Sequence, residues 1–126
     1  MSFNFRGALE ESKKKSNVNY KAVEFLQDLI EAINNPLYPE RAKDLKKLTF
    51  SLEKADTKAG NSFRIRVYGK DDFSSEDEVI FEKYYSKRGY LGSLLRAIQR
   101  KLEQEKFETK SVDTETSLDV FEVKID

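Results

Sequence analysis

The chain has 126 residues, 38% of them apolar and 37% charged, and its 23 lysines and arginines are balanced by 23 acidic residues. It contains neither cysteine nor histidine. Their absence excludes disulfides, thiolate nucleophiles, histidine acid–base catalysis and the usual zinc sites. The length suits one domain with one core. The sequence therefore predicts a single folded domain and favours a non-enzymatic role that needs no cofactor and no metal.

The beginning of the chain carries no targeting pattern. Residues 1–16, MSFNFRGALEESKKKS, lack the cationic start and the apolar run of a signal peptide. Nowhere does the sequence hold the roughly 18 consecutive apolar residues that a membrane-spanning helix needs. We therefore expect a soluble, intracellular protein in the cytoplasm, with no membrane partner. The balanced charge also argues against a protein that coats nucleic acid, since such domains carry a basic excess.

Helical patterns dominate the first part of the chain. Residues 1–18 are expected to form a short N-terminal helix or arm. Residues 19–34 carry apolar side chains at helical spacing and end at an Asn-Asn-Pro sequence, which predicts a long helix that packs on the core. A shorter helix is expected to begin at Pro39, a residue suited to the first helical position, and to end near Leu48.

The spacing of apolar residues then changes to strict alternation, which predicts a β-hairpin within residues 48–68. Pairing Leu52 with Ile65 turns the apolar side chains of both strands toward one face. The same register sets Glu53 opposite Arg64 on the other face, where the two form a cross-strand ion pair.

The remaining elements are three strands and one helix. Residues 79–85, VIFEKYY, alternate again, residues 89–106 form a helix with a leucine-rich face, and the chain ends with a weak strand, a turn near residues 113–116 and a final strand. Residues 19–126 are thus predicted to form one two-layer α+β domain. Its antiparallel sheet has four to five strands with the helices packed on one face, in the order α-α-β-β-β-α-β-β.

One stretch is unusually basic. Residues 86–102, SKRGYLGSLLRAIQRKL, hold five cationic side chains and no acid, and they span the start and length of the last predicted helix. Tyrosine and arginine are side chains that protein interfaces favour. We predict a partner-binding surface formed by Lys87, Arg88, Tyr90, Arg96, Arg100 and Lys101. A second candidate surface is the outer face of the hairpin, at Arg64, Arg66 and Tyr68.

The leading functional hypothesis is a small intracellular binding or regulatory protein, of inhibitor or adaptor type, whose partner is another protein. Tyr84, Tyr85 and Tyr90 lie close in sequence to the arginines, an arrangement that also suggests a tyrosine nucleophile with arginine clamps. No acid–base group accompanies them, so an interface explains them better. The oligomeric state stays open.

The first alternative is a nucleic-acid-binding module that uses residues 86–102. The order helix, three antiparallel strands, helix is also that of a double-stranded RNA-binding domain, and Lys87 and Arg88 occupy the place where that fold has phosphate-contacting lysines. The sequence turns apolar at Tyr90 and Leu91, and two extra strands follow. The likeness is therefore one of element order only.

The second alternative is a metal-dependent nuclease. Glu122 and Lys124 form an E-x-K pair on one face of the last predicted strand, and such enzymes combine this pair with an upstream aspartate to hold Mg²⁺ and activate water. Asp113 is the candidate aspartate. Because alternating charged residues on a solvent-facing strand produce the same sequence, this alternative ranks third.

Overall fold

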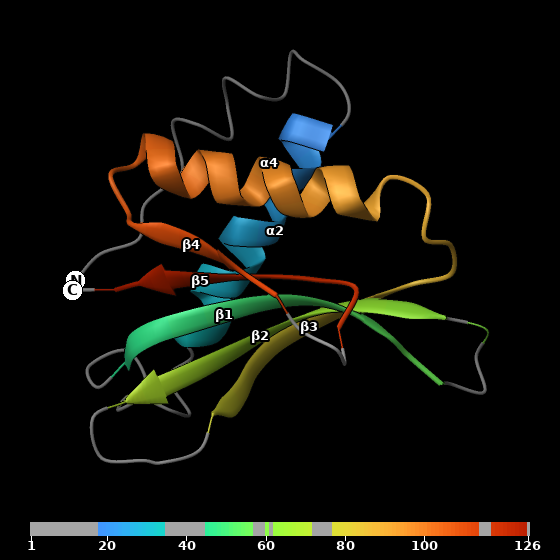
Figure 1. The fold of residues 1–126 in the computed structure, drawn as a ribbon, viewed down its shortest axis with the longest axis horizontal. Coiled ribbons are helices and arrows are strands. Elements are labelled where there is room, and N and C mark those ends of the chain that lie inside the picture. Colours follow the sequence, from blue (N-terminus) through green and yellow to red (C-terminus); the bar gives the residue numbers. More distant parts are fainter. Residues whose placement is uncertain are drawn as a thin grey trace.

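The computed structural model describes residues 18–34, 45–56, 60, 62–71, 77–113 and 117–125. In this part of the chain two helices lie on one face of a five-stranded antiparallel sheet (Figure 1). The helices are α2 (Val18–Ile33) and α4 (Leu91–Gln104), and the strands are β1 (Leu45–Lys54), β2 (Phe63–Asp71), β3 (Glu78–Tyr85), β4 (Thr109–Val112) and β5 (Asp119–Lys124). This arrangement confirms the predicted two-layer α+β fold.

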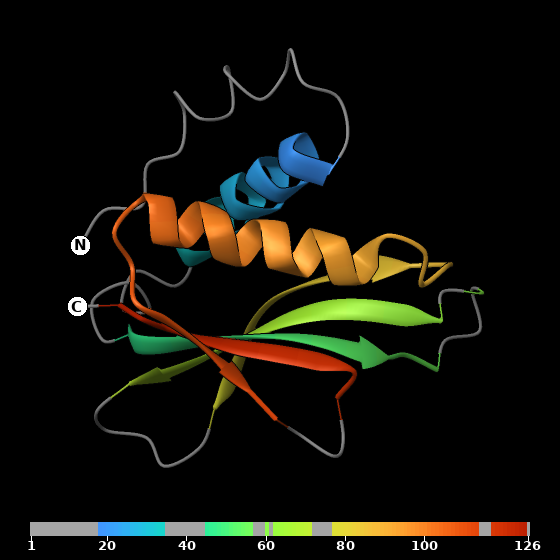
Figure 2. The same cartoon turned by 45° about the horizontal axis from the view of Figure 1, so that its top comes forward.

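The strands follow one another in the order β3-β2-β1-β5-β4, so β5 lies between β1 and β4 although it comes last in the chain. Strands β1, β2 and β3 form a meander. The connection through α4 then carries the chain across one face of the sheet from the β3 edge to the β4 edge (Figure 2). Consequently β3 and β4 are the two edge strands. This strand order was beyond sequence reasoning, because nothing local records that β1 has a second partner.

The hairpin has the predicted register. Leu52 pairs with Ile65 and Glu53 pairs with Arg64. The two apolar side chains are buried in the core, and Arg64 Nε lies 2.7 Å from Glu53 Oε1 on the opposite face. Alternation of apolar and polar residues therefore decided the register and the side-chain directions over the paired segments 50–54 and 63–67.

The core lies between the sheet and the helices and is rich in phenylalanine. The rings of Phe50 and Phe121, on neighbouring strands, stack with their centroids 4.8 Å apart. Phe25 of α2 meets Phe81 of β3 edge to face at 5.2 Å. The predicted buried face of α4 is confirmed at Leu91, Leu94, Leu95, Ile98 and Leu102. These contacts fix both helices on the same face of the sheet.

Two predicted elements need comment. The prediction of a short helix that ends near Leu48 is wrong for its last residues, because Leu45–Leu48 belong to β1. Pairing with β2 and β5 satisfies the backbone groups of these residues, and Leu45 and Leu48 are buried in the core. The rest of that helix, and residues 1–17 of the arm expected over residues 1–18, lie outside the described residues, whereas Val18 belongs to α2. Within the described part of the chain, no helix has the length and apolar character needed to cross a lipid bilayer.

Candidate functional site

The predicted basic surface follows the outer side of α4. Lys87 and Arg88 are exposed in the segment before the helix, and Arg96 and Arg100 are exposed one turn apart on it. Lys101 is half-buried and donates a hydrogen bond to Gln104 at 3.3 Å. Among the residues that the structure describes, neither arginine of α4 has an ion-pair partner. The positive charge of these two side chains is therefore available to solvent or to a ligand.

Tyr90 lies at the start of α4 and belongs to a different group of residues. Four of the chain's six tyrosines gather around one hollow of about 300 Å³, which we name the tyrosine pocket. Its lining residues are Tyr20, Lys21, Glu24, Lys83, Tyr84, Tyr85, Tyr90 and Leu94. They come from α2, from the edge strand β3 and from the start of α4. The structure thus joins Tyr90 to Tyr84 and Tyr85, as their sequence positions suggested, but Arg96 and Arg100 do not line the pocket.

Both lysines of the tyrosine pocket are held in place. Lys21 Nζ donates a hydrogen bond to Tyr90 Oη at 3.0 Å and lies 4.4 Å from the centre of the same ring, a cation–π distance. Lys83 Nζ lies 2.7 Å from Asp28 Oδ2 and 3.8 Å from Glu24 Oε1. These contacts link β3 and the start of α4 to α2.

The ionisation of Tyr85 argues against a tyrosine nucleophile. Burial, and then the nearby Tyr90, Glu24 and Asp28, raise the pKa of Tyr85 well above its ordinary value. A phenol with a raised pKa gives up its proton less readily, and a neutral phenol is a weak nucleophile. The ring is better suited to packing and hydrogen bonding than to catalysis.

The second predicted surface, around Arg64, Arg66 and Tyr68, lies on the helix-free face of the sheet. Its charged groups pair with one another there. Arg64 Nε and Tyr68 Oη both donate to the carboxylate of Glu53 at 2.7 Å, and Arg66 lies 2.7 Å from Glu82. The arginines of this surface are therefore already neutralised by glutamates on neighbouring strands, so they offer little uncompensated charge to a partner.

The pKa of Glu53 reports the same network. Burial by itself would raise this pKa, but hydrogen bonds from Tyr68, Arg64 and Ser51 lower it below its ordinary value. Glu53 consequently stays ionised and keeps accepting both hydrogen bonds at neutral pH.

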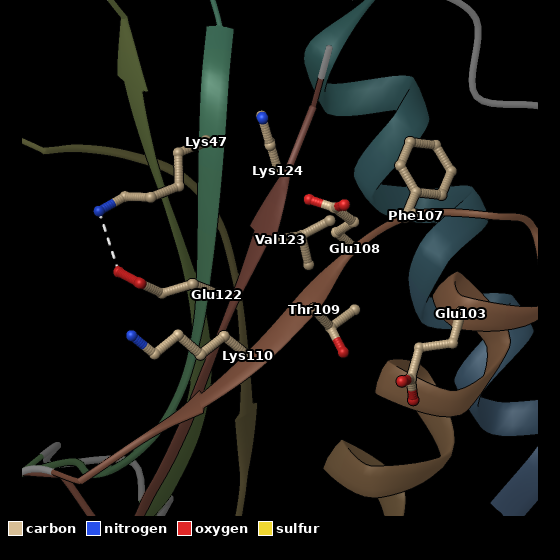
Figure 3. Close-up of a pocket in the computed structure, with 9 residues that line it drawn as sticks. All are labelled: Lys47, Glu103, Phe107, Glu108, Thr109, Lys110, Glu122, Val123 and Lys124. Atoms are coloured by element: carbon tan, nitrogen blue, oxygen red, sulfur yellow. Dashed lines mark hydrogen bonds and ion pairs between the residues drawn. The ribbon is translucent and has the colours of Figure 1, made fainter.

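The residues of the nuclease alternative lie in different places. Glu122 lines a pocket of about 690 Å³ at the β4 edge, which we name the lysine pocket, and its Oε2 lies 3.0 Å from Lys47 Nζ (Figure 3). Lys124 lines the same pocket. Asp113 instead lines a separate hollow with Glu53 and Tyr68. Across the described ranges, no three histidine, cysteine or carboxylate side chains come together in a way that could hold a metal ion.

Sequence reasoning missed two of these features. It assigned Tyr20 only to the buried side of a helix and did not connect it with the tyrosines some 65 positions later. It also treated Lys124 without Lys47 and Lys110, which β1 and β4 bring beside it. In both cases the signal is a pairing between distant segments, and no single stretch of sequence contains it.

Comparison of the chain with protein-family models, with curated proteins and with solved structures found no match. A functional proposal therefore has to start from the residues described above.

Proposed function

We propose that the protein is a small protein-binding module of regulatory type, and that its contact surface is the tyrosine pocket with Lys87 and Arg88 beside it. The distribution of exposed apolar side chains carries this proposal. In the described part of the chain, the large hydrophobic side chains that are most exposed are Val79, Tyr84 and Tyr90, at 40%, 38% and 39%. Tyr84 and Tyr90 both line the tyrosine pocket, whereas Val79 lies near the other end of β3 and does not line it. Single exposed hydrophobic residues such as Val79 are common, but two exposed tyrosines at one pocket support an interaction site there.

The composition of this surface fits a protein partner better than a small metabolite. Tyrosine and arginine are enriched where protein interfaces contribute most binding energy, because their flat groups bury apolar area while their polar ends make hydrogen bonds. Since Lys21 and Lys83 are already anchored, little side-chain entropy is lost when a partner covers the tyrosine pocket. Binding there would use a surface that exists before the partner arrives.

The partner expected from the charges is acidic. Lys87 and Arg88 are exposed, and within the described residues neither forms an ion pair. A segment with an apolar side chain for the tyrosine pocket and carboxylates for Lys87 and Arg88 would satisfy both parts of the surface. Arg96, Arg100 and Lys101 continue the cationic surface along α4 and would contact a larger partner.

Affinity capture from the protein's own cell, quantified by mass spectrometry, tests this proposal. The wild type is compared with Tyr84→Ala plus Tyr90→Ala, with Arg96→Ala plus Arg100→Ala, and with Lys110→Ala on the opposite edge of the sheet as the control. The tyrosine variant should lose the captured protein, the arginine variant should retain less of it, and the control should match the wild type. Equal capture by the wild type and a folded tyrosine variant contradicts the proposal.

Nucleic-acid binding is the second candidate, and the solvent-exposed Arg96 and Arg100 favour it. Four cations then follow one helix, from Lys87 and Arg88 before it to the two arginines on it. If the partner is a duplex, affinity should fall steeply as salt rises, and the slope should become shallower in Arg96→Ala plus Arg100→Ala. Titration of labelled duplex RNA and DNA at several salt concentrations measures this. No binding at low salt excludes this candidate.

A further inference from the structure

Three lysines on neighbouring strands lie on the helix-free face of the sheet. Lys47 of β1 lies directly opposite Lys124 of β5, and Lys110 of β4 lies directly opposite Glu122 of β5. Opposite residues of an antiparallel pair lie on the same face, with Cβ atoms about 4.5–5.5 Å apart. Phe121 and Val123 of β5 are buried in the core, so Glu122 and Lys124 project from the other face. The strand register therefore concentrates positive charge at one end of this face.

The charge of this group is only partly compensated. Among the described residues, Glu122 is the one carboxylate that pairs with these lysines, and its Oε2 lies 3.0 Å from Lys47 Nζ. In the part of the chain that the structure describes, neither Lys110 nor Lys124 forms an ion pair. Glu103 and Glu108 also line the lysine pocket, so three carboxylates balance its three ammonium groups overall, and positive charge predominates only at the lysine end. Lys47 and Lys124 lie directly opposite each other, and like charges in such positions destabilise a sheet.

The same side chains line the lysine pocket, whose volume of about 690 Å³ lies in the range of small-molecule sites. Figure 3 shows the pocket from the side: the three lysines lie at one end of it, and Glu103 of α4 lies at the other. Glu108 and Thr109 lie between these ends, with Val123 beside them. The pocket thus has a cationic end and carboxylate acceptors in its middle and at its other end.

We propose that the lysine pocket binds a phosphorylated small polyol, such as a sugar phosphate. A phosphate monoester carries a charge of about −1.5 to −2 at neutral pH, which the lysine end of the pocket attracts. Ammonium groups also make the strong, charge-assisted hydrogen bonds that phosphate accepts. The carboxylates of Glu103 and Glu108 accept hydrogen bonds from hydroxyl groups. The pocket lies at the β4 edge, so this proposal is independent of the tyrosine pocket at the β3 edge.

Isothermal titration calorimetry at low ionic strength tests the proposal with three compounds: glucose 6-phosphate, inorganic phosphate and glucose. Glucose 6-phosphate should bind most tightly, inorganic phosphate more weakly, and glucose not measurably. Replacing both lysines that have no described partner, in Lys110→Gln plus Lys124→Gln, should weaken the binding of both phosphate compounds by about tenfold or more. Glu103→Gln should weaken only glucose 6-phosphate, because inorganic phosphate does not reach that end. Lys54→Gln, at the far end of β1, is the matched control and should bind like the wild type.

Amide shifts in nuclear magnetic resonance spectra locate the binding, and a thermal melt shows that each variant is folded. Because Lys47 and Lys124 repel each other, Lys124→Gln alone should melt at a higher temperature than the wild type in low salt. The site is refuted if the wild type binds neither phosphate compound, or if the double lysine variant binds both as the wild type does. Equal binding of inorganic phosphate and glucose 6-phosphate refutes the polyol part. Tighter binding of duplex DNA at the same lysines refutes the small-ligand assignment.

Discussion

Replacing Gly69 with alanine should lower the free energy of unfolding by about 1–3 kcal/mol, the usual cost of inserting a methyl group into a packed core. Gly69 lies on β2 between the side chains of two neighbouring strands. A Cβ atom added there would lie 2.6 Å from Cδ2 of Leu45 and 2.8 and 2.9 Å from Cγ1 and Cδ1 of Ile80. Favourable carbon–carbon contacts are about 3.5–4.0 Å. Both neighbours are buried, so their side chains would have to shift within the core to make room for the methyl group.

The matched control is the same substitution at Gly92. Gly92 lies in α4, and no heavy atom lies within 4 Å of the position that its Cβ would take. Alanine is favoured over glycine within a helix by about 0.5–1 kcal/mol, so Gly92→Ala should stabilise the protein by up to that amount. The two variants thus carry the same chemical change and should shift stability in opposite directions.

Urea unfolding of the wild type and both variants, followed by circular dichroism, measures these differences. The dependence of the unfolding free energy on urea should stay the same, so that a change in midpoint reports stability alone. A Gly69→Ala variant within about 0.5 kcal/mol of the wild type would refute the reasoning, because it would place the substitution in the range of ordinary surface changes. Leu45 and Ile80 would then have room to rearrange.

Three further predictions concern the core, the sheet face and metal ions. Leu95→Ala should destabilise by about 2–5 kcal/mol in urea unfolding, because Leu95 is 1% exposed, and a loss under about 0.5 kcal/mol would mean that α4 faces the other way. The pKa of Glu53 is lower in the folded state than its ordinary value of 4.5. Ionised Glu53 therefore stabilises the fold at pH values above 4.5, and this contribution disappears as the pH falls through the folded-state pKa. As the pH is lowered through this range, the urea midpoint of Glu53→Gln should therefore fall less than that of the wild type. If the two midpoints depend on pH in the same way, the hydrogen-bond network around Glu53 is contradicted. Adding Mg²⁺, Mn²⁺ or Zn²⁺ should leave the melting temperature unchanged, whereas a rise with Mg²⁺ that Glu122→Ala abolishes would favour the nuclease alternative.

Sequence reasoning succeeded for the fold where a pattern repeats within one element. Alternation around Leu52 and Ile65 is enough to set a hairpin register, because a slip of one residue would turn every apolar side chain to the wrong face. It failed at residues 45–47, where lysines beside leucines fit a helix and a strand equally well. The choice there depends on β2 and β5, which supply the hydrogen bonds on either side of β1.

The candidate site divides in the same way. That Arg96 and Arg100 lie on the outer side of a helix followed from the leucines on its other side. That Tyr90 shares a pocket with Tyr20 depended on how α2 and α4 pack over β3. A stretch of sequence shows which side chains share a face of one element, but not which face of another element will meet it.

By itself, the sequence determined the type of most elements, the buried face of α4, the hairpin register and the lack of cysteine and histidine chemistry. These properties follow from residue identity and from periods of two and 3.6 residues, which act over a few neighbours. Only the tertiary structure decided that β5 enters the sheet between β1 and β4. This placement sets Lys124 against Lys47 and Glu122 against Lys110. The physical reason is that backbone hydrogen bonds in a sheet are the same for any pair of strands, so the choice of partner comes from how the side chains of the whole chain pack into one core.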